Sequence, residues 1–260
     1  MNFKSPSSPT EPTNKVMLIT GASRGIGAAT ARLAAQRGYT VVINYRQQAR
    51  IAEALVEEIR QHGGQAIALQ ADVADEDDVS RLFSAIDTQL GRLDALINNA
   101  GMLERQMPLV EMSLQRWQRV FATNAFGSFL CCREAVKRMS SRQGGSGGVI
   151  VNLSSVAARL GAAQEYIDYA AAKGAVDSMT IGLAKELAPD GIRVNAVRPG
   201  VIDTEIHASG GEPGRVSRVA SSIPLARGGN ATEVAEAILW LASEQASYTT
   251  GALLDVSGGR

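Results

Sequence analysis

The sequence lacks three features: an excess of charge of either sign, long apolar runs, and more than two cysteines. Lys plus Arg and Asp plus Glu both number 26, so the formal net charge is zero. Without a basic surplus the chain is poorly suited to a nucleic-acid backbone or an anionic membrane, and we expect neither as a partner. No apolar run approaches the roughly 18 residues that span a bilayer. We therefore expect a soluble, cytoplasmic protein.

Cysteine and histidine are scarce, with two residues of each. Cys131 and Cys132 are neighbours in a segment of helical pattern, where consecutive side chains point in different directions. We expect both to be reduced thiols in a reducing compartment. His62 and His207 are far apart in the sequence, and no spacing of Cys and His typical of a metal site occurs. The sequence predicts no metal.

The alternation of short and long segments predicts an α/β fold. From residue 15 onward, β-branched or apolar runs alternate with helical patterns, which is typical of a parallel sheet covered by helices on both faces. We predict strands at residues 16–20, 40–45, 66–70, 95–98, 149–153, 193–198 and 252–256. We predict helices at residues 25–37, 49–62, 76–90, 117–139, 169–187 and 232–243. The chain length suits a single doubly wound Rossmann domain over residues 15–260.

Three segments do not follow this alternation of strands and helices. Residues 1–14 are rich in Ser, Pro and Thr and lack the apolar core of a secretory signal, so we expect a disordered tail. Residues 140–148 read as a flexible surface loop. Residues 205–230 follow a strand end and show no clear periodicity. Ligands of open α/β sheets bind beyond the carboxyl ends of strands, so we predict a substrate loop there, with a plain surface loop as the alternative.

A glycine-rich turn follows the first predicted strand. Residues 20–27 read TGASRGIG and lead into an Ala-rich helix. Glycines let backbone N–H groups approach a pyrophosphate at the positive end of the helix dipole. No Gly-Lys-Ser/Thr follows, which disfavours a P-loop, while a purely structural turn stays open. The predicted dinucleotide contacts in this turn are Gly21, Ser23, Arg24, Gly25, Ile26 and Gly27.

The end of the second predicted strand favours NADP over NAD. An Asp or Glu at that position would bind the NAD ribose and repel a 2′-phosphate. Tyr45 stands there, Arg46 follows it, and residues 21–52 contain no acidic residue. The guanidiniums of Arg24 and Arg46 suit a phosphate dianion. NAD remains the weaker alternative.

Tyr169 and Lys173 are four residues apart and therefore share one face of a predicted helix. An ammonium beside a phenol favours the phenolate, so we expect Lys173 to lower the pKa of Tyr169 toward the working pH of a general acid or base. The spacing alone also fits an ordinary surface pair. Other motifs are needed to decide between the two.

With those motifs included, the chain resembles the short-chain dehydrogenases/reductases over about residues 15–260. The resemblance rests on the order and spacing of several short motifs. They are residues 20–27, Asp72-Val73, residues 98–101 (NNAG), Asn124, Ser154-Ser155, Tyr169-x-x-x-Lys173, Arg198-Pro199-Gly200 with Thr204, Thr250-Gly251 and Gly258-Gly259.

The resemblance implies a role for each matching residue. Tyr169 would give a proton to the carbonyl oxygen or take one from the alcohol, Ser155 would hydrogen-bond that oxygen, and Lys173 would lower the pKa of Tyr169 and bind the nicotinamide ribose. Asn124 would hold a water in a proton relay. Ser155 lies one residue further from Tyr169 than is commonest in the family. The remaining implied cofactor contacts are Asp72 (to adenine), Val73, Asn98, Ala100, Gly101, Pro199, Gly200, Ile202 and Thr204.

The sequence thus predicts an oxidoreductase that moves a hydride between NADP(H) and a carbonyl or alcohol substrate. A sensor or scaffold that binds the dinucleotide without chemistry is the alternative from another class, and an epimerase or dehydratase of the same fold is a third. Similar proteins assemble through the helices predicted at 117–139 and 169–187, so the resemblance implies a homotetramer or homodimer. Sugars, ketoacyl thioesters, steroids and small ketones all stay open as substrates.

Overall fold

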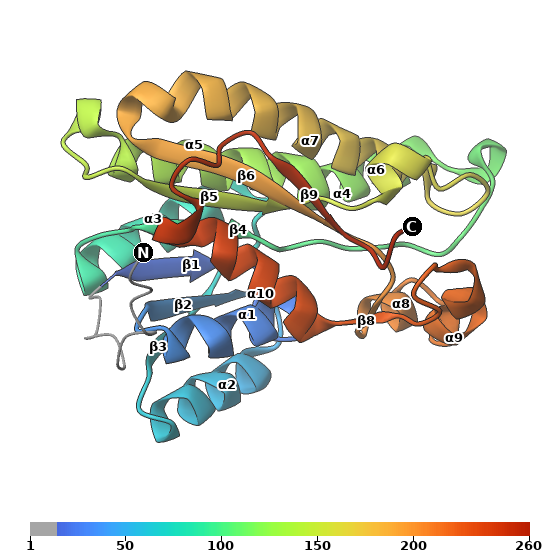
Figure 1. Cartoon of the computed structure of the whole chain (residues 1–260), viewed down its shortest axis with the longest axis horizontal. Coiled ribbons are helices and arrows are strands. Elements are labelled where there is room, and N and C mark those ends of the chain that lie inside the picture. Colours follow the sequence, from blue (N-terminus) through green and yellow to red (C-terminus); the bar gives the residue numbers. More distant parts are fainter. Residues whose placement is uncertain (1–14) are drawn as a thin grey trace, which may run out of the picture.

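Seven parallel strands form the central sheet, in the order β3-β2-β1-β4-β5-β6-β9 (Figure 1). The structure, a computed structural model, describes residues 15–260, so the predicted tail at 1–14 lies outside the described residues. The strands are β1 (Val16–Ile19), β2 (Thr40–Tyr45), β3 (Gln65–Gln70), β4 (Ala95–Asn98), β5 (Gly148–Leu153), β6 (Ile192–Pro199) and β9 (Leu253–Val256). Each predicted strand is present within one residue at either end, and the predicted doubly wound α/β fold is confirmed.

Helices cover both faces of this sheet (Figure 1). The main helices are α1 (Gly25–Gln36), α2 (Ala49–Gln61), α3 (Glu76–Leu90), α4 (Leu114–Phe121), α5 (Gly127–Met139), α7 (Ile167–Leu187) and α10 (Ala231–Ala242). The single helix predicted at 117–139 is wrong in detail, because a π-helical turn at Ala122–Phe126 separates α4 from α5. Such a turn carries one extra residue and often marks a functional site.

The strand residues alternate between two cores. Met17 and Ile19 of β1 pack with residues of α1, α2 and α10 on one face of the sheet. Leu18 points the other way, into a core that includes Phe83 of α3 and Cys131 of α5. Side chains of a strand alternate between faces, so a strand buried on both sides must be apolar throughout. This explains why β1 and β4 read as continuous apolar runs.

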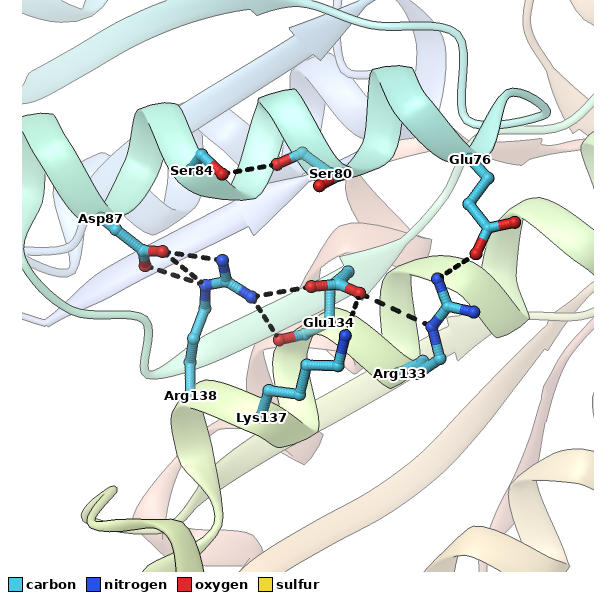
Figure 2. Close-up of polar contacts among 8 residues, drawn as sticks. All are labelled: Glu76, Ser80, Ser84, Asp87, Arg133, Glu134, Lys137 and Arg138. Atoms are coloured by element: carbon cyan, nitrogen blue, oxygen red, sulfur yellow. Dashed lines mark hydrogen bonds and ion pairs between the residues drawn. The ribbon is translucent and has the colours of Figure 1, made fainter.

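Polar side chains of α3 and α5, two of the helices that cover the Leu18 side of the sheet, form a network of hydrogen bonds and ion pairs (Figure 2). Glu134 accepts hydrogen bonds from Lys137 at 2.6 Å and from Arg138 at 3.1 Å. Arg138 also reaches Asp87 of α3 at 2.7 Å, and Arg133 pairs with Glu76 at 2.6 Å. These contacts tie α5 to α3 along its length and fix the helix that continues from the π-helical turn.

Strand order reverses between β1 and β4, which are neighbours in the sheet although β2 and β3 separate them in the sequence. The loops after these two strands therefore leave in opposite directions and open a crevice at the carboxyl edge of the sheet. Every motif noted in the sequence between residues 20 and 204 follows or ends a strand at this edge, except Asn124, Tyr169 and Lys173, which come from helices.

The segment at 205–230, predicted as a substrate loop, contains short helical elements that the sequence analysis did not predict. It contains α8 (Ile206–Ser209), α9 (Arg215–Val219) and a 3-10 turn at Ala220–Ser222. β7 (Ile202–Asp203) pairs with β8 (Gly229–Asn230), and this pairing brings the two ends of the segment close together. Figure 1 shows α8 and α9 at one end of the molecule, beyond the carboxyl edge of the sheet. The short elements have too few turns to produce a readable period.

A short α6 (Ala157–Leu160) precedes α7 and was also absent from the prediction. Within residues 15–260, no helix combines the length and apolar character that crossing a bilayer requires.

A buried ion pair joins α4 to the start of α7. Arg116 donates to Asp168 at 2.6 Å, and the two side chains are 3% and 1% exposed. Arg116 also donates to the carbonyl oxygen of Arg105 at 2.5 Å. The pair therefore fixes the residue that precedes Tyr169.

We expect Arg116→Met to lower the free energy of unfolding by about 3–5 kcal/mol, because Asp168 would be left as an unpaired buried charge. Arg119→Met is the matched control, since Arg119 lies on the same helix in an exposed pair with Glu104 and should change stability little. Urea unfolding of both variants measures this. Equal losses of unfolding free energy in Arg116→Met and Arg119→Met would contradict a special role of the buried ion pair.

Candidate active site

A cleft of about 560 Å³ lies at the carboxyl edge of the sheet. The glycine turn after β1 lines one end and Tyr169 the other, and the loops after β4, β5 and β6 lie between them. Of the residues predicted for the site, the cleft is lined by Gly21, Ser23, Arg24, Gly25, Ile26, Tyr45, Arg46, Asp72, Val73, Ala100, Gly101, Ser155, Tyr169, Lys173, Pro199, Gly200, Ile202 and Thr204. The fold therefore brings most of the predicted set together.

Two glycines of the turn have left-handed backbone conformations. Gly21 has φ of 60° and Gly25 has φ of 56°, values that residues with a Cβ rarely adopt. No side chain fits at Gly27, because a Cβ there would lie 2.6 Å from Asn99 Nδ2. The turn leads directly into the N-terminus of α1, where, among the described residues, no side chain makes a capping hydrogen bond. This arrangement fits a pyrophosphate.

Two asparagines that were not among the predicted site residues support this turn, although Asn99 lies within the motif at residues 98–101. Asn44 in β2 accepts a hydrogen bond from Gly21 N at 3.2 Å and donates to the carbonyl oxygen of Ala71 at 3.1 Å. Asn99 donates through Nδ2 to the carbonyl oxygens of Thr20 and Gly21, at 2.8 and 3.1 Å. An asparagine inside an otherwise apolar strand was the available signal for Asn44.

The arginines predicted to select the cofactor lie at the end of the cleft next to this turn. Arg24 and Arg46 are both exposed and both line the cleft. Arg46 Nη1 is 3.5 Å from Asp72 Oδ2, while Arg24 forms no ion pair with any described carboxylate. The two guanidiniums are thus available to an anionic group of the ligand.

Tyr169 and Lys173 lie on the cleft side of α7. The Lys173 ammonium is 3% exposed and donates a 2.6 Å hydrogen bond to the carbonyl oxygen of Leu153, the last residue of β5. Lys173 Nζ is 5.6 Å from the centre of the Tyr169 ring. Tyr169 packs partly buried against Val120 and Ala172, so its ring is held on one side by α4 and on the other by its own helix.

Burial is the largest influence on the pKa values of Tyr169 and Lys173. It raises the pKa of Tyr169 to about 12, against an opposing effect of hydrogen bonding by Ser155. Burial also lowers the pKa of Lys173 to about 8, against the charge of Asp177 one turn further along α7. Burial, and not Lys173, sets the direction of this pKa shift, and the expected lowering of the Tyr169 pKa by Lys173 stays a prediction. At neutral pH Tyr169 is a neutral phenol and most Lys173 is charged.

The remaining predicted residues differ in their placement. Ser155 lines the cleft and accepts a hydrogen bond from Ala157 N at 3.1 Å, which fixes its hydroxyl at the start of α6. Asn124 lies fully buried in the π-helical turn, where Oδ1 accepts from Met102 N and Nδ2 donates to Met102 O, both at 3.1 Å. It thereby ties this turn to the loop after β4. A Cβ at Gly101 would lie 3.0 Å from Asn124 Oδ1 and 3.7 Å from Lys173 Nζ.

Asn98 does not line the cleft, which corrects the prediction. Its Nδ2 donates to Asn152 Oδ1 at 2.9 Å and to the carbonyl oxygen of Ser128 at 3.3 Å, below the floor of the cleft. Because β4 alternates its side chains, Asn98 points into the core under α5 while Asn99 takes the cleft position. Gly27 likewise lies beneath the turn and supports it through its small size.

The comparisons with known proteins agree with this geometry. The sequence model of the family described as "Enoyl-(Acyl carrier protein) reductase" matches residues 21–260. The chain is 58% identical over 245 residues to the uncharacterized oxidoreductase YgfF of Escherichia coli, covering 94% of this chain and 99% of that protein. It is 43% identical over 249 residues to a 3-oxoacyl-[acyl-carrier-protein] reductase of Synechocystis, covering 95% and 97%.

The chain belongs to the short-chain dehydrogenase/reductase family. A further relative, 3beta-hydroxysteroid dehydrogenase 1 of Eggerthella lenta, is 42% identical over 246 residues, covering 94% of this chain and 93% of the other. The three named relatives are oxidoreductases, and the two whose names give a substrate differ in it, one acting on a 3-oxoacyl group and the other on a 3beta-hydroxysteroid. The family match thus establishes an oxidoreductase that uses a nicotinamide dinucleotide and a small-molecule substrate, as the sequence predicted.

Gly27 tests whether the glycine turn needs its close packing. We expect Gly27→Ala to weaken binding of the nicotinamide dinucleotide at least tenfold, because the new methyl group overlaps Asn99 and Ala22 and displaces the turn by overpacking. Gly174→Ala is the control, since no atom lies within 4 Å of a Cβ there and alanine favours a helix. Fluorescence titration with NADPH measures both affinities. Unchanged binding in Gly27→Ala would refute the role of the turn.

Proposed function

We propose that this protein is an NADP(H)-dependent oxidoreductase that interconverts a carbonyl compound and its alcohol, with Tyr169 as the proton donor to the carbonyl oxygen. One observation carries the proposal. A single cleft holds Tyr169, Ser155 and Lys173 at one end and the glycine turn with Arg24 and Arg46 at the other. The bound nicotinamide would supply the hydride in the direction of reduction and accept it in the reverse direction.

Tyr169 is suited to the role of acid. Because burial raises the pKa of Tyr169 to about 12, its hydroxyl keeps its proton at neutral pH and can give it to an oxygen that gains negative charge. Ser155 hydrogen-bonds the same oxygen and orients it toward the phenol. The Lys173 ammonium then stabilises the phenolate that forms, since the two groups lie on one face of α7.

Lys173 would also bind the ribose hydroxyls of the cofactor, which its position between Tyr169 and the loop after β4 supports. Asn124 is a positioning residue in this scheme. Its side chain and Lys173 Nζ both lie close to Gly101, so we propose that a water held by Asn124 returns a proton to the lysine.

The choice of NADP over NAD is supported by Arg24 and Arg46 and by Tyr45 at the end of β2. A carboxylate would have to stand near Tyr45 to hold the unphosphorylated ribose. Asp72 pairs with Arg46 at 3.5 Å and lies one strand further out, where we propose that it contacts the adenine.

The proposal further includes a cytoplasmic location and a homo-oligomer. The two cysteines are free, buried thiols, which suits a reducing compartment. Phe126 and Phe129 are 56% and 52% exposed near the start of α5, and such exposed aromatic side chains support contact with a second copy of the chain.

Replacing the phenol hydroxyl tests the acid directly. We expect Tyr169→Phe to lower the rate of carbonyl reduction by about 10²- to 10⁴-fold, the usual contribution of a general acid, and to leave NADPH binding nearly unchanged. Tyr248→Phe, at a fully exposed site outside the cleft, is the control. Full activity of Tyr169→Phe would exclude this residue as the acid. Wild-type protein that binds NADPH and turns over no carbonyl or alcohol would favour the sensor or scaffold.

A second test concerns the cofactor. Arg24→Ala and Arg46→Ala should each raise the KM for NADPH about 10- to 100-fold and change the KM for NADH by less than about threefold, because each removes a charge-assisted hydrogen bond to phosphate. Arg50→Ala removes an exposed arginine outside the cleft and serves as control. A parallel loss with both cofactors would contradict recognition of the 2′-phosphate.

A further inference from the structure

Beyond Tyr169 the cleft ends in a polar group of side chains that the proposed reaction does not use. We refer to it as the polar end of the cleft. It consists of Glu165, Tyr166, His207 and Arg215, and it adjoins the apolar Leu103 and Ile206. Tyr166 comes from the start of α7, whereas His207 and Arg215 come from α8 and α9, so the folded segment after β7 supplies half of it.

Two atoms at the polar end are buried and make no hydrogen bond of normal geometry, although the Gln106 amide lies close enough to Tyr166 Oη to influence its pKa. Tyr166 is 3% exposed and His207 is 8% exposed, and both line the cleft. Among the described residues, only five buried side-chain polar atoms lack such a hydrogen bond, and Tyr166 Oη and His207 Nδ1 are two of them. A buried polar atom without a partner costs free energy, so two at one end of one cleft need an explanation.

Tyr166 Oη lies next to Gly210, the residue that ends the helix of His207. A Cβ built on Gly210, the residue that ends α8, would lie 3.4 Å from Tyr166 Oη and 3.5 Å from the carbonyl oxygen of His207. The phenol hydroxyl therefore contacts the same short helix that carries the imidazole.

The hydrogen-bonding character of His207 follows from its other nitrogen. Nε2 is 2.9 Å from the carbonyl oxygen of Ile202, which can only accept, so Nε2 carries the proton. Burial lowers the pKa of His207, which keeps the ring neutral. His207 Nδ1 is thus a free acceptor.

Tyr166 supplies the complementary donor. Burial raises the pKa of Tyr166, with an opposing effect of the Gln106 amide, so the phenol stays protonated. Gln106 itself donates to Glu212 at 2.5 Å. The Arg215 guanidinium lies 5.1 Å from the centre of the Tyr166 ring and holds the ring in place.

The charges around the polar end cancel. Arg215 pairs with Glu165 at 2.5 Å and with Glu212 at 3.1 Å. Arg218 pairs with Glu165 at 3.2 Å and also with Glu212. Arg215 and Arg218 are thus matched by Glu165 and Glu212, so neither guanidinium is left without a carboxylate partner. An uncharged group fits best.

We propose that the polar end of the cleft is a subsite for a hydroxyl group, and that the preferred substrates are uncharged carbonyl compounds that carry such a hydroxyl. A substrate hydroxyl can donate to His207 Nδ1 or accept from Tyr166 Oη, so either residue can supply its partner. This inference rests on the proposed function, because it assumes that the reacting carbonyl lies at Tyr169.

The test compares ketones that differ only by a hydroxyl. Purified protein with NADPH is assayed on cyclohexanone and on derivatives that carry one hydroxyl on each successive ring carbon. We expect the kcat/KM of at least one hydroxyketone to exceed that of cyclohexanone by about tenfold or more. The ratio should fall toward one in Tyr166→Phe or in His207→Gln, which keeps a donor for Ile202 O. Tyr39→Phe, outside the cleft, should keep the wild-type ratio.

The outcomes separate this inference from the proposed function. Ketone reduction with no hydroxyl preference at any position, or a preference that both variants retain, would overturn the subsite and leave the reaction intact. If wild-type protein reduces no ketone, the proposed function fails, and the hydroxyketones are then tested as ligands by thermal unfolding. A larger rise in Tm with the hydroxyketone than with cyclohexanone, lost in Tyr166→Phe or in His207→Gln, would support the subsite, and equal shifts would overturn it.

Discussion

The arrangement of the site depends on one buried hydrogen bond, from the Lys173 ammonium to the carbonyl oxygen of Leu153 at 2.6 Å. It joins the middle of α7 to the end of β5, and so places a charged group and a phenol at the carboxyl edge of the sheet. An ammonium at a position 3% exposed costs free energy of desolvation, which is why burial lowers the pKa of Lys173 to about 8. The sheet provides the acceptor that makes this burial tolerable.

The same burial determines the chemistry that Tyr169 can perform. If a neighbouring ammonium lowered the pKa of a phenol toward neutrality, the phenol would serve equally as acid or base. In this cleft burial raises the pKa of Tyr169 to about 12, so the phenol is protonated at neutral pH. In the proposed function it gives this proton to the carbonyl oxygen during reduction and takes one back in the reverse direction. At the other end of the cleft, Asn44 and Asn99 hold the glycine turn, so both ends are fixed by polar groups from the sheet.

The fold and most of the site could be predicted from the sequence because both leave local patterns. Apolar strands buried on both faces and the TGASRGIG turn are contiguous in the chain, and the four-residue spacing of Tyr169 and Lys173 is a helical period. The break at the π-helical turn, the short helices α8 and α9, and the buried pair of Arg116 with Asp168 depend on contacts between distant segments and left no such pattern. The prediction that Asn98 lines the cleft was wrong because the sequence does not show which side chains at the end of a strand point toward the cleft.

The most direct test of the central claim is a spectrophotometric titration of tyrosinate in the wild-type protein against Tyr169→Phe. If Tyr169 is held as a protonated acid, the difference between the two proteins shows no tyrosinate from about pH 6 to about pH 9, below the usual pKa of tyrosine. A tyrosinate signal of one residue that appears within this range, and that is absent from Tyr169→Phe, would contradict the account.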